Sequence, residues 1–330
     1  MVDGMPAALT ERAERLLRAA EQPGAAGWVP APCRNAATVA LIRDCKEGLQ
    51  VFLQRRSRSL AFAAGMYVFP GGVVEAQDFD SDLPWRSQPG AGPFRTGVDV
   101  ETAHLPGSED PVPAGSAIGT PARQPAGLYG ALVAAAVRET LEEAGVLVAA
   151  DGKREVGRYA SSSKPSAEVD VVRKALVSGE SLANVLVGAG VWLDPLALVP
   201  FRHWLTPGIE SRRYDTRFFV AVAARRNDAR VANEESDDAQ WISPRRALDQ
   251  VRDGRAAMLP PTIDMLQTLC RHDHSDSVLA ARPTRISPII PRPHRREDAA
   301  IGWSLVDGYT GGALAAGEGP LSLADATGGV

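Results

Sequence analysis

The stretch Arg138-Glu139-Thr140-Leu141-Glu142-Glu143-Ala144-Gly145 determines how the rest of this chain is interpreted. From Leu128 to Ala144 apolar side chains recur with the period of an α-helix, which predicts one helix with a buried stripe. Gly145 follows at the position where a glycine commonly ends a helix. The charged residues of the stretch are therefore expected in the last turns of a helix.

Three glutamates of this helix, Glu139, Glu142 and Glu143, are spaced i, i+3 and i+4. At about 100° per residue, their side chains share one narrow face. Like charges so close repel one another unless water solvates them or a cation lies between them. One interpretation is a solvated acidic surface. The other is a Mg²⁺ or Mn²⁺ site, because these ions prefer oxygen ligands. Arg138 can orient one carboxylate through a bidentate pair, and the whole Arg-Glu-Glu-Glu-Gly pattern favours the metal site.

Short apolar runs upstream of the helix indicate β-structure. Residues 36–42 and 49–54 predict two strands joined by a polar turn, hence a hairpin. Residues 67–69 predict a third strand, which Pro70-Gly71-Gly72 stops. The other predicted elements are helices at 7–21, 245–252 and 261–269, two short helices within 167–190, and strands at 218–223 and 239–242.

The helix and the Gly-Gly pair together resemble the signature of the Nudix hydrolases. In that signature a glycine and a glutamate precede a short spacer and the run Arg-Glu-apolar-x-Glu-Glu-x-Gly. Residues 138–145 match the run, and Gly72 matches the opening glycine. There are three departures: Asp78 stands where the first glutamate is expected, Thr140 replaces an apolar residue, and the spacer is lengthened to residues 79–137. Because the cost of closing a loop grows only with the logarithm of its length, the two halves can still meet.

Segments outside the helix are similar to one subgroup of this family, the peroxisomal acyl-coenzyme-A diphosphatase-like proteins. The similar segments are 62–72, 203–207, 213–219 and 259–262, within a resemblance that covers most of residues 36–270. Coenzyme-A-cleaving members also carry an arginine motif before the Gly-Gly pair. Arg56 matches its first arginine, whereas Ala61 occupies the second arginine position and Arg58 is a candidate to replace it.

The resemblance implies an α/β Nudix fold, a mixed β-sheet sandwiched between α-helices, with two insertions. We expect an N-terminal helix and loop at 1–34 and a Nudix domain at 35–270, with insertions at about 79–127 and 150–190. A Pro/Arg/Gly-rich extension follows at 271–330. The first insertion has no visible period, which is typical of a functional lid or a disordered segment.

The resemblance also implies a reaction, the metal-dependent hydrolysis of a pyrophosphate bond in a nucleoside diphosphate linked to another group. Coenzyme A or acyl-coenzyme A is the leading substrate, and ADP-ribose or a dinucleotide is the alternative. A non-catalytic Nudix-fold binding module is the alternative function. The expected cofactor is Mg²⁺ or Mn²⁺, held by Glu139, Glu142 and Glu143.

Catalytic roles are expected for Glu142, Glu143 and Arg138, with one of the two glutamates orienting or deprotonating water. Trp204, with Phe218, is expected to stack a base or to line the pocket. For these aromatic residues, and for the candidates named next, the alternative interpretations are surface charge, core packing or a tight turn. The expected substrate-binding residues are Arg56, Gly71, Gly72, Trp204 and Arg213, and Glu235 is a candidate additional base or metal ligand.

Composition excludes several classes of protein. The 36 basic and 40 acidic residues give a net charge of −4, which does not suggest a nucleic-acid binder. Cys33, Cys45 and Cys270 are too widely spaced for a zinc or disulfide framework and fit a reducing compartment. The sequence shows no signal-peptide pattern and no apolar run long enough to span a membrane. We therefore expect a cytoplasmic protein whose partner is a nucleotide-containing small molecule, with the oligomeric state left open.

Overall fold

The computed structural model describes residues 31–60, 63–86, 127–151, 166–208, 210–223, 229–231, 235–284, 286–295 and 301–307, with a few residues of 11–18. Of the predicted helix at 7–21, residues 11, 13, 14, 17 and 18 are described, and all are helical. Ala61, at the second arginine position of the coenzyme A motif, lies outside the described residues. In this part of the chain every helix is too short or too polar to cross a lipid bilayer.

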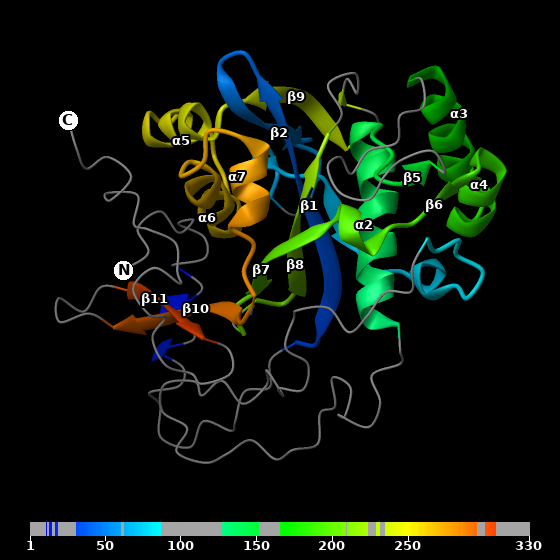
Figure 1. The fold of residues 1–330 in the computed structure, drawn as a ribbon. Coiled ribbons are helices and arrows are strands. Elements are labelled where there is room, and N and C mark those ends of the chain that lie inside the picture. Colours follow the sequence, from blue (N-terminus) through cyan, green and yellow to red (C-terminus); the bar gives the residue numbers. More distant parts are fainter. Residues whose placement is uncertain are drawn as a thin grey trace.

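The centre of the fold is a mixed sheet, which Figure 1 shows with helices on either side of it. Its strand order is β11-β10-β7-β8-β1-β2-β3, with β4 paired to β1 and β9 paired to β2. The β1–β8 and β7–β10 pairs are parallel and the others antiparallel. The strands are β1 (Cys33–Cys45), β2 (Gly48–Arg56), β3 (Tyr67–Val68), β4 (Gly71–Val73), β7 (Val199–Leu205), β8 (Arg213–Val222), β9 (Ser236–Ile242), β10 (Pro288–Arg295) and β11 (Ile301–Asp307).

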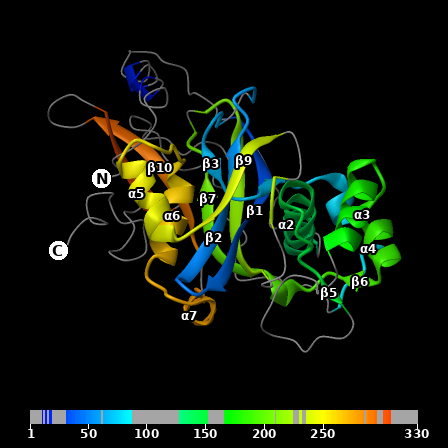
Figure 2. The same ribbon diagram turned by 90° about the horizontal axis from the view of Figure 1, so that it is seen from above.

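Helices cover both faces of the sheet. Figure 2 shows α5 and α6 on one side and α2 on the other, with α3 and α4 beyond α2. A short ribbon of β5 (Ala150–Asp151) and β6 (Val191–Trp192) joins these outer helices to α2. This arrangement confirms the predicted α/β fold. The helices are α2 (Leu128–Ala144), α3 (Ser166–Val177), α4 (Leu182–Ala189), α5 (Pro244–Arg252), α6 (Pro260–Leu269) and α7 (Ser275–Ala280).

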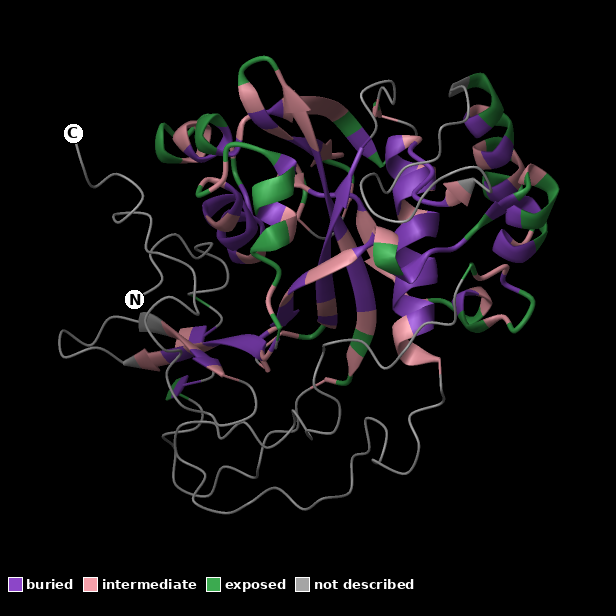
Figure 3. Ribbon diagram, in the orientation of Figure 1, coloured by how far each residue is buried: buried purple, intermediate pink, exposed green. Residues whose placement is uncertain are grey.

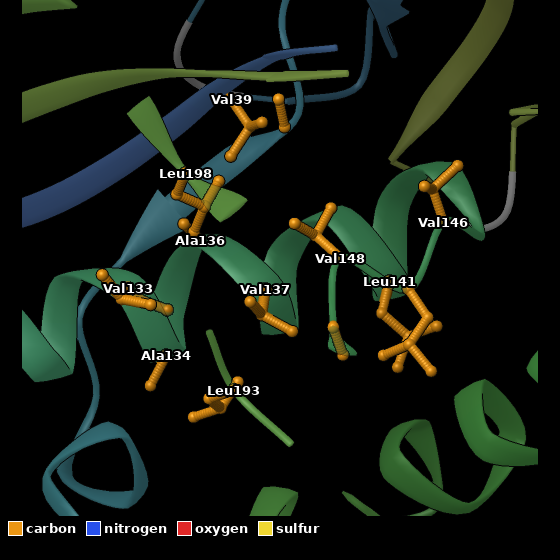
Figure 4. Packing of buried hydrophobic residues seen from close by; sticks show 14 of the residues in the cluster. Val39, Val133, Ala134, Ala136, Val137, Leu141, Val146, Val148, Leu193 and Leu198 are labelled. Carbon is orange, nitrogen blue, oxygen red and sulfur yellow. The ribbon is translucent and has the colours of Figure 1, made fainter. Parts of the chain in front are cut away.

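Helix α2 has the predicted bounds and is buried on almost every side (Figure 3). Small and branched apolar residues allow this, because β1 packs on one side and the segments around β6 on the other. Figure 4 shows Ala136 near Val39 of β1, and Leu193 on the opposite side of the helix. Gly145 ends the helix in the left-handed conformation at φ 66°, as predicted. The glutamates at this end are therefore held on a rigid element.

Several predicted elements need correction. Gly71 and Gly72 do not simply stop a strand: they begin β4, which pairs with Ala36–Thr38 of β1. Strand β7 was not predicted, and β10, from the expected extension at 271–330, pairs with β7 at the sheet. The expected first insertion is described only at its start. Residues 79–86 are part of the packed structure, with Trp85 bridged to Leu193, and residues 87–126 lie outside the described part of the chain.

Candidate active site

The strand β4 and the helix α2 approach so closely that only glycine fits between them. A Cβ atom on Gly72 would lie 2.2 Å from Oε1 of Glu139. A Cβ atom on Gly71 would lie 2.5 Å from the carbonyl oxygen of Ala37 and 2.7 Å from Thr38 Cα. Both contacts are far shorter than atoms tolerate. Gly72 is therefore required for the Glu139 carboxylate to lie against β4, and Gly71 is required for the close approach of β4 to β1.

The two halves of the split signature meet through a buried ion pair. Arg138 donates from Nε to Oδ1 of Asp78 at 3.0 Å and from Nη2 to Oδ2 at 3.1 Å. The side chains are 3% and 0% exposed. The backbone N–H of Glu75 donates to Asp78 Oδ2 at 2.7 Å, and the Val73 carbonyl accepts from Arg138 at 2.9 Å. Asp78, which departs from the signature, thus supplies the carboxylate that holds the arginine.

Arg138 in turn positions two of the glutamates. Its Nη1 donates to Glu139 Oε1 at 2.8 Å and lies 3.3 Å from Glu142 Oε2. Burial lowers the pKa of Arg138, but Asp78, Glu139 and Glu142 outweigh this effect and raise it above the ordinary value. The arginine therefore stays charged and joins the two carboxylates at one end of the helix.

Glu143 is held by a different set of donors. Its Oε2 accepts the backbone N–H of Gly71 at 2.9 Å and the side-chain amide of Gln54 at 2.6 Å. Burial, with the nearby charge of Glu139, raises the pKa of Glu143 to about 8. The sequence interpretation missed Gln54. Its signal is that a polar residue directly follows the apolar run Val51–Leu53, and the structure buries it with that run.

The other two glutamates also resist ionisation. Burial raises the pKa of Glu139 to about 7 despite the guanidinium of Arg138, and it raises the pKa of Glu142 above its ordinary value. Carboxylates this close in a low-dielectric site disfavour each other's charge. The cluster of Asp78, Glu139, Glu142 and Glu143 is therefore short of positive charge.

The donor set suits a hard divalent cation. Carboxylate oxygens are the ligands that Mg²⁺ and Mn²⁺ prefer, and a dication would offset the excess of negative charge in the cluster. Among the residues that the structure describes, no group of three or more His, Cys, Asp or Glu side chains is arranged so that it could hold a metal ion. The fit of Glu139, Glu142 and Glu143 to the expected metal therefore rests on their oxygen donors and on their position at one end of α2.

A pocket of about 460 Å³ lies on the other side of β4, between the sheet and the start of α6. Three of the predicted substrate-binding residues, Arg56, Gly71 and Trp204, line it. Gly71 belongs to both regions, because it lines the pocket and its N–H binds Glu143. Arg56 is near enough to Glu143 to favour its charged form. The pocket and the carboxylate cluster thus meet at Gly71.

Trp204 forms a fixed wall of this pocket. It is 2% exposed, and its indole N–H donates to Asp264 Oδ2 at 2.9 Å. Arg202 also binds Asp264, with Nε 3.2 Å from Oδ2. Phe218 beside it is 5% exposed. The two rings are mostly covered by protein, which favours lining of the pocket over stacking of a base.

Two predicted residues lie elsewhere. Arg213 is buried and does not line the pocket: its guanidinium donates to the carbonyls of Thr206 at 3.3 Å and Ala31 at 2.8 Å. The pocket therefore gives no support to the predicted role of Arg213 in substrate binding, because β8 directs it to the opposite face from Thr216 and Phe218. Glu235 is exposed, and its carbonyl accepts from Ser57 N–H at 2.7 Å, which places it beside the Arg56 end of β2.

Known proteins share this fold. A solved NUDIX hydrolase from Alicyclobacillus acidocaldarius superimposes with a TM-score of 0.57 at 24% identity, covering 77% of this chain and 98% of its own. The chain therefore has a Nudix fold. The two halves of its split signature are the α2 carboxylates and the Gly-Gly strand β4. The sequence profile of the NUDT19 Nudix domain matches residues 17–269, so the chain belongs to that family.

Relatives within the family carry an activity in their names. Acyl-coenzyme A diphosphatase NUDT19 of Gallus gallus is 34% identical over 240 residues, covering 67% of this chain and 60% of the relative. Its Xenopus laevis counterpart is 25% identical over the same shares of the two chains. The chain thus spans about 60% of the length of these relatives.

Proposed function

We propose that this protein hydrolyses the pyrophosphate bond of coenzyme A or acyl-coenzyme A with the help of Mg²⁺ or Mn²⁺. The observation that carries the proposal is the meeting of two features at Gly71. On one side lie Glu139, Glu142 and Glu143, whose pKa values burial raises, and on the other lies a pocket of small-molecule size. The names of the relatives support the substrate.

Each residue of the cluster has a distinct part in this proposal. Glu139, Glu142 and Glu143 would hold the cation, which when bound neutralises charge on the phosphates and lowers the pKa of water. Asp78 and Arg138 fix Glu139 and Glu142, and Gln54 fixes Glu143. Glu142 has the most exposed side chain of the three, at 24%. It is therefore our choice to orient the attacking water, since it can reach solvent.

The reaction is a simple hydrolysis. Water adds to one phosphorus of the diphosphate, the bridging P–O bond breaks, and the products are 3′,5′-ADP and phosphopantetheine. Gly71 and Arg56 lie between the carboxylates and the pocket, where the diphosphate must bind for one arm of the substrate to enter the pocket. An arginine and a strand edge without side chains are suited to phosphate oxygens.

A substrate panel tests the proposal. Purified protein is incubated with Mn²⁺ or Mg²⁺ and with coenzyme A, acyl-coenzyme A, ADP-ribose or a dinucleotide. We expect release of 3′,5′-ADP from the first two, loss of turnover in Glu142→Gln, and normal turnover in Glu47→Gln, which removes a charge from the exposed β1–β2 turn. Turnover of ADP-ribose alone would contradict the substrate, and no turnover of any compound would support a binding module instead.

Two further expectations stay predictions. The predicted domain boundaries at residues 34 and 270 are tested by limited proteolysis. Strand β10, which lies beyond residue 270, pairs with β7 in the sheet. A cytoplasmic location stays an expectation from the sequence, and cell fractionation tests it.

A further inference from the structure

The pocket beside Gly71 has walls that are unlike those of a phosphate site. Most of its lining is apolar, contributed by Met66, Val68, Trp204, Leu205, Phe218 and Leu259. Among the described lining residues the charged ones are Arg56 and Glu210, whose charges are opposite. A group that carries several negative charges would be desolvated here with little compensation, which costs much free energy. The lining therefore favours a neutral ligand.

The start of helix α6 reinforces this selection. A helix N-terminus usually attracts anions, because its first N–H groups point outward unpaired. Here Pro260 and Pro261 occupy the first two helical positions, and proline has no N–H. The next N–H, that of Thr262, already donates to the Leu259 carbonyl at 2.9 Å. This helix end thus lines the pocket but offers a phosphate few donors.

The polar groups of the pocket are of another kind. Thr38, Thr206, Thr216 and Thr262 all contribute to its lining. A hydroxyl group both donates and accepts, so it can satisfy the amide groups of an otherwise apolar chain. Arg56 is the lining cation nearest the carboxylates, since it affects the pKa of Glu143. Phosphate is thus favoured at the Gly71 end, and an uncharged amide chain deeper in the pocket.

We infer that this pocket binds the pantetheine arm of the substrate, and that the 3′-phosphoadenosine half binds outside it. The inference rests on the proposed function. The two halves of coenzyme A differ in charge: the nucleotide half carries an additional phosphate, whereas the pantetheine arm is neutral. The pocket favours the neutral arm for three reasons: its charges balance, prolines begin the helix that lines it, and four threonines contribute to its lining.

Two substitutions that fill the pocket test the inference. Val68→Phe, on β3, and Thr216→Ile, on β8, add volume from different strands, and both positions are half-buried. Val187→Phe, at a position 62% exposed on α4, is the control for added aromatic surface. Circular dichroism and thermal unfolding establish that each variant is folded. The dissociation constants of phosphopantetheine and 3′,5′-ADP are then measured by calorimetry with Mn²⁺ present.

The two products distinguish the outcomes. We expect a filled pocket to weaken phosphopantetheine binding by about tenfold or more, and to leave 3′,5′-ADP binding within about twofold, because the sites are separate. Weakened binding of 3′,5′-ADP alone, equal weakening of both, or failure of the unaltered protein to bind phosphopantetheine would overturn the inference. Coenzyme A turnover by the unaltered protein is measured on the same preparation. If that turnover is present, the proposed function stands even where the binding measurements overturn the inference about the pocket.

Discussion

Asp78 and Arg138 are separated by 60 positions in the sequence, yet they form a bidentate ion pair that solvent hardly reaches. The pair joins the segment that follows the Gly-Gly strand to the helix that carries the glutamates. It also explains why Asp is accepted where the signature has Glu, because the carboxylate still reaches both Nε and Nη2 of the arginine. The long spacer is tolerated because Asp78 and Arg138 still meet in the folded protein.

Removal of this pair is expected to be costly. Asp78→Asn leaves the guanidinium of Arg138 buried with one partner fewer, and breaking a buried ion pair in this way costs about 3–5 kcal/mol of unfolding free energy. Asp82→Asn, at an exposed position of the same loop, removes the same charge and is the control. Urea unfolding measures both. Equal stability of the two variants would show that the pair is not needed for the fold.

Gly72→Ala tests the contact between β4 and the helix. The added methyl group would lie 2.2 Å from Glu139 Oε1, so the carboxylate must move. A displacement of about 1 Å commonly costs about 100-fold in rate, and we expect that loss in turnover together with weaker Mn²⁺ binding. Gly188→Ala, where a Cβ meets no atom within 4 Å, should keep full turnover. Normal Mn²⁺ affinity in Gly72→Ala would contradict the proposed role of Glu139.

Gln54→Leu separates function from stability. The amide nitrogen of Gln54 binds Glu143, but its Oε1 is buried without a hydrogen-bond partner among the described atoms. Leucine removes both the hydrogen bond to Glu143 and the buried Oε1 that has no partner among the described atoms. The two effects on the free energy of unfolding should therefore offset to within about 1 kcal/mol. Loss of a group that orients a metal ligand should still lower metal affinity or turnover by about 10–100-fold.

The control for this change lies on the same strand. Gln50 is half-buried and its Oε1 accepts from Arg43 at 3.0 Å, away from the carboxylates. Gln50→Leu should leave turnover unchanged. Unchanged turnover and metal binding in Gln54→Leu as well would remove Gln54 from the site.

A pH dependence of stability follows from His203. Burial, with the neighbouring Arg217, lowers the pKa of His203 below its ordinary 6.5, although Asp215 opposes the shift. The unfolded chain therefore binds a proton more readily than the folded protein does. The stability that His203 contributes is complete above pH 6.5 and falls as the pH drops below it, by up to about 1.4 kcal/mol per pH unit for one proton.

The neighbouring carboxylate acts in the same direction at lower pH. Burial raises the pKa of Asp215, but Arg217 and His203 outweigh it and hold the pKa below its ordinary 3.8. Between pH 8 and pH 5 the raised pKa values of Glu139 and Glu143 act in the opposite direction, because the folded protein holds their protons more tightly. The part due to His203 is therefore measured as a difference: as the pH falls from 6.5 to 5, the unfolding free energy of the unaltered protein should drop relative to that of His203→Gln. The exposed residue His274, changed in the same way, should leave the slope as it is. A difference between the unaltered protein and His203→Gln that does not change with pH would assign the proton to another group.

The sequence predicted best where a single element carries the pattern. The bounds of α2, its glycine cap and the β1–β2 hairpin follow from local periodicity and turn chemistry, and the structure confirms them. The Ser243 cap of α5, followed by Pro244, is equally local: its hydroxyl accepts from Arg246 N–H.

What the sequence could not predict depends on contacts between distant residues. Gly71 and Gly72 have the composition of a turn, and only the approach of β1 makes them a strand. Arg213 has the same charge as Arg56, but the alternation of side chains along β8 turns it away from the pocket. Gln54 is marked only by its burial, which depends on β9 and α2.

The position of Gly71 has a consequence for how such a protein can diversify. One peptide unit is the boundary between two regions whose side chains come from opposite faces of the sheet. Substitutions on the α6 face can alter which molecule is accepted while every carboxylate on the α2 face remains in place. Natural variation or laboratory selection could therefore explore new substrates on one face without first losing the capacity for bond cleavage on the other.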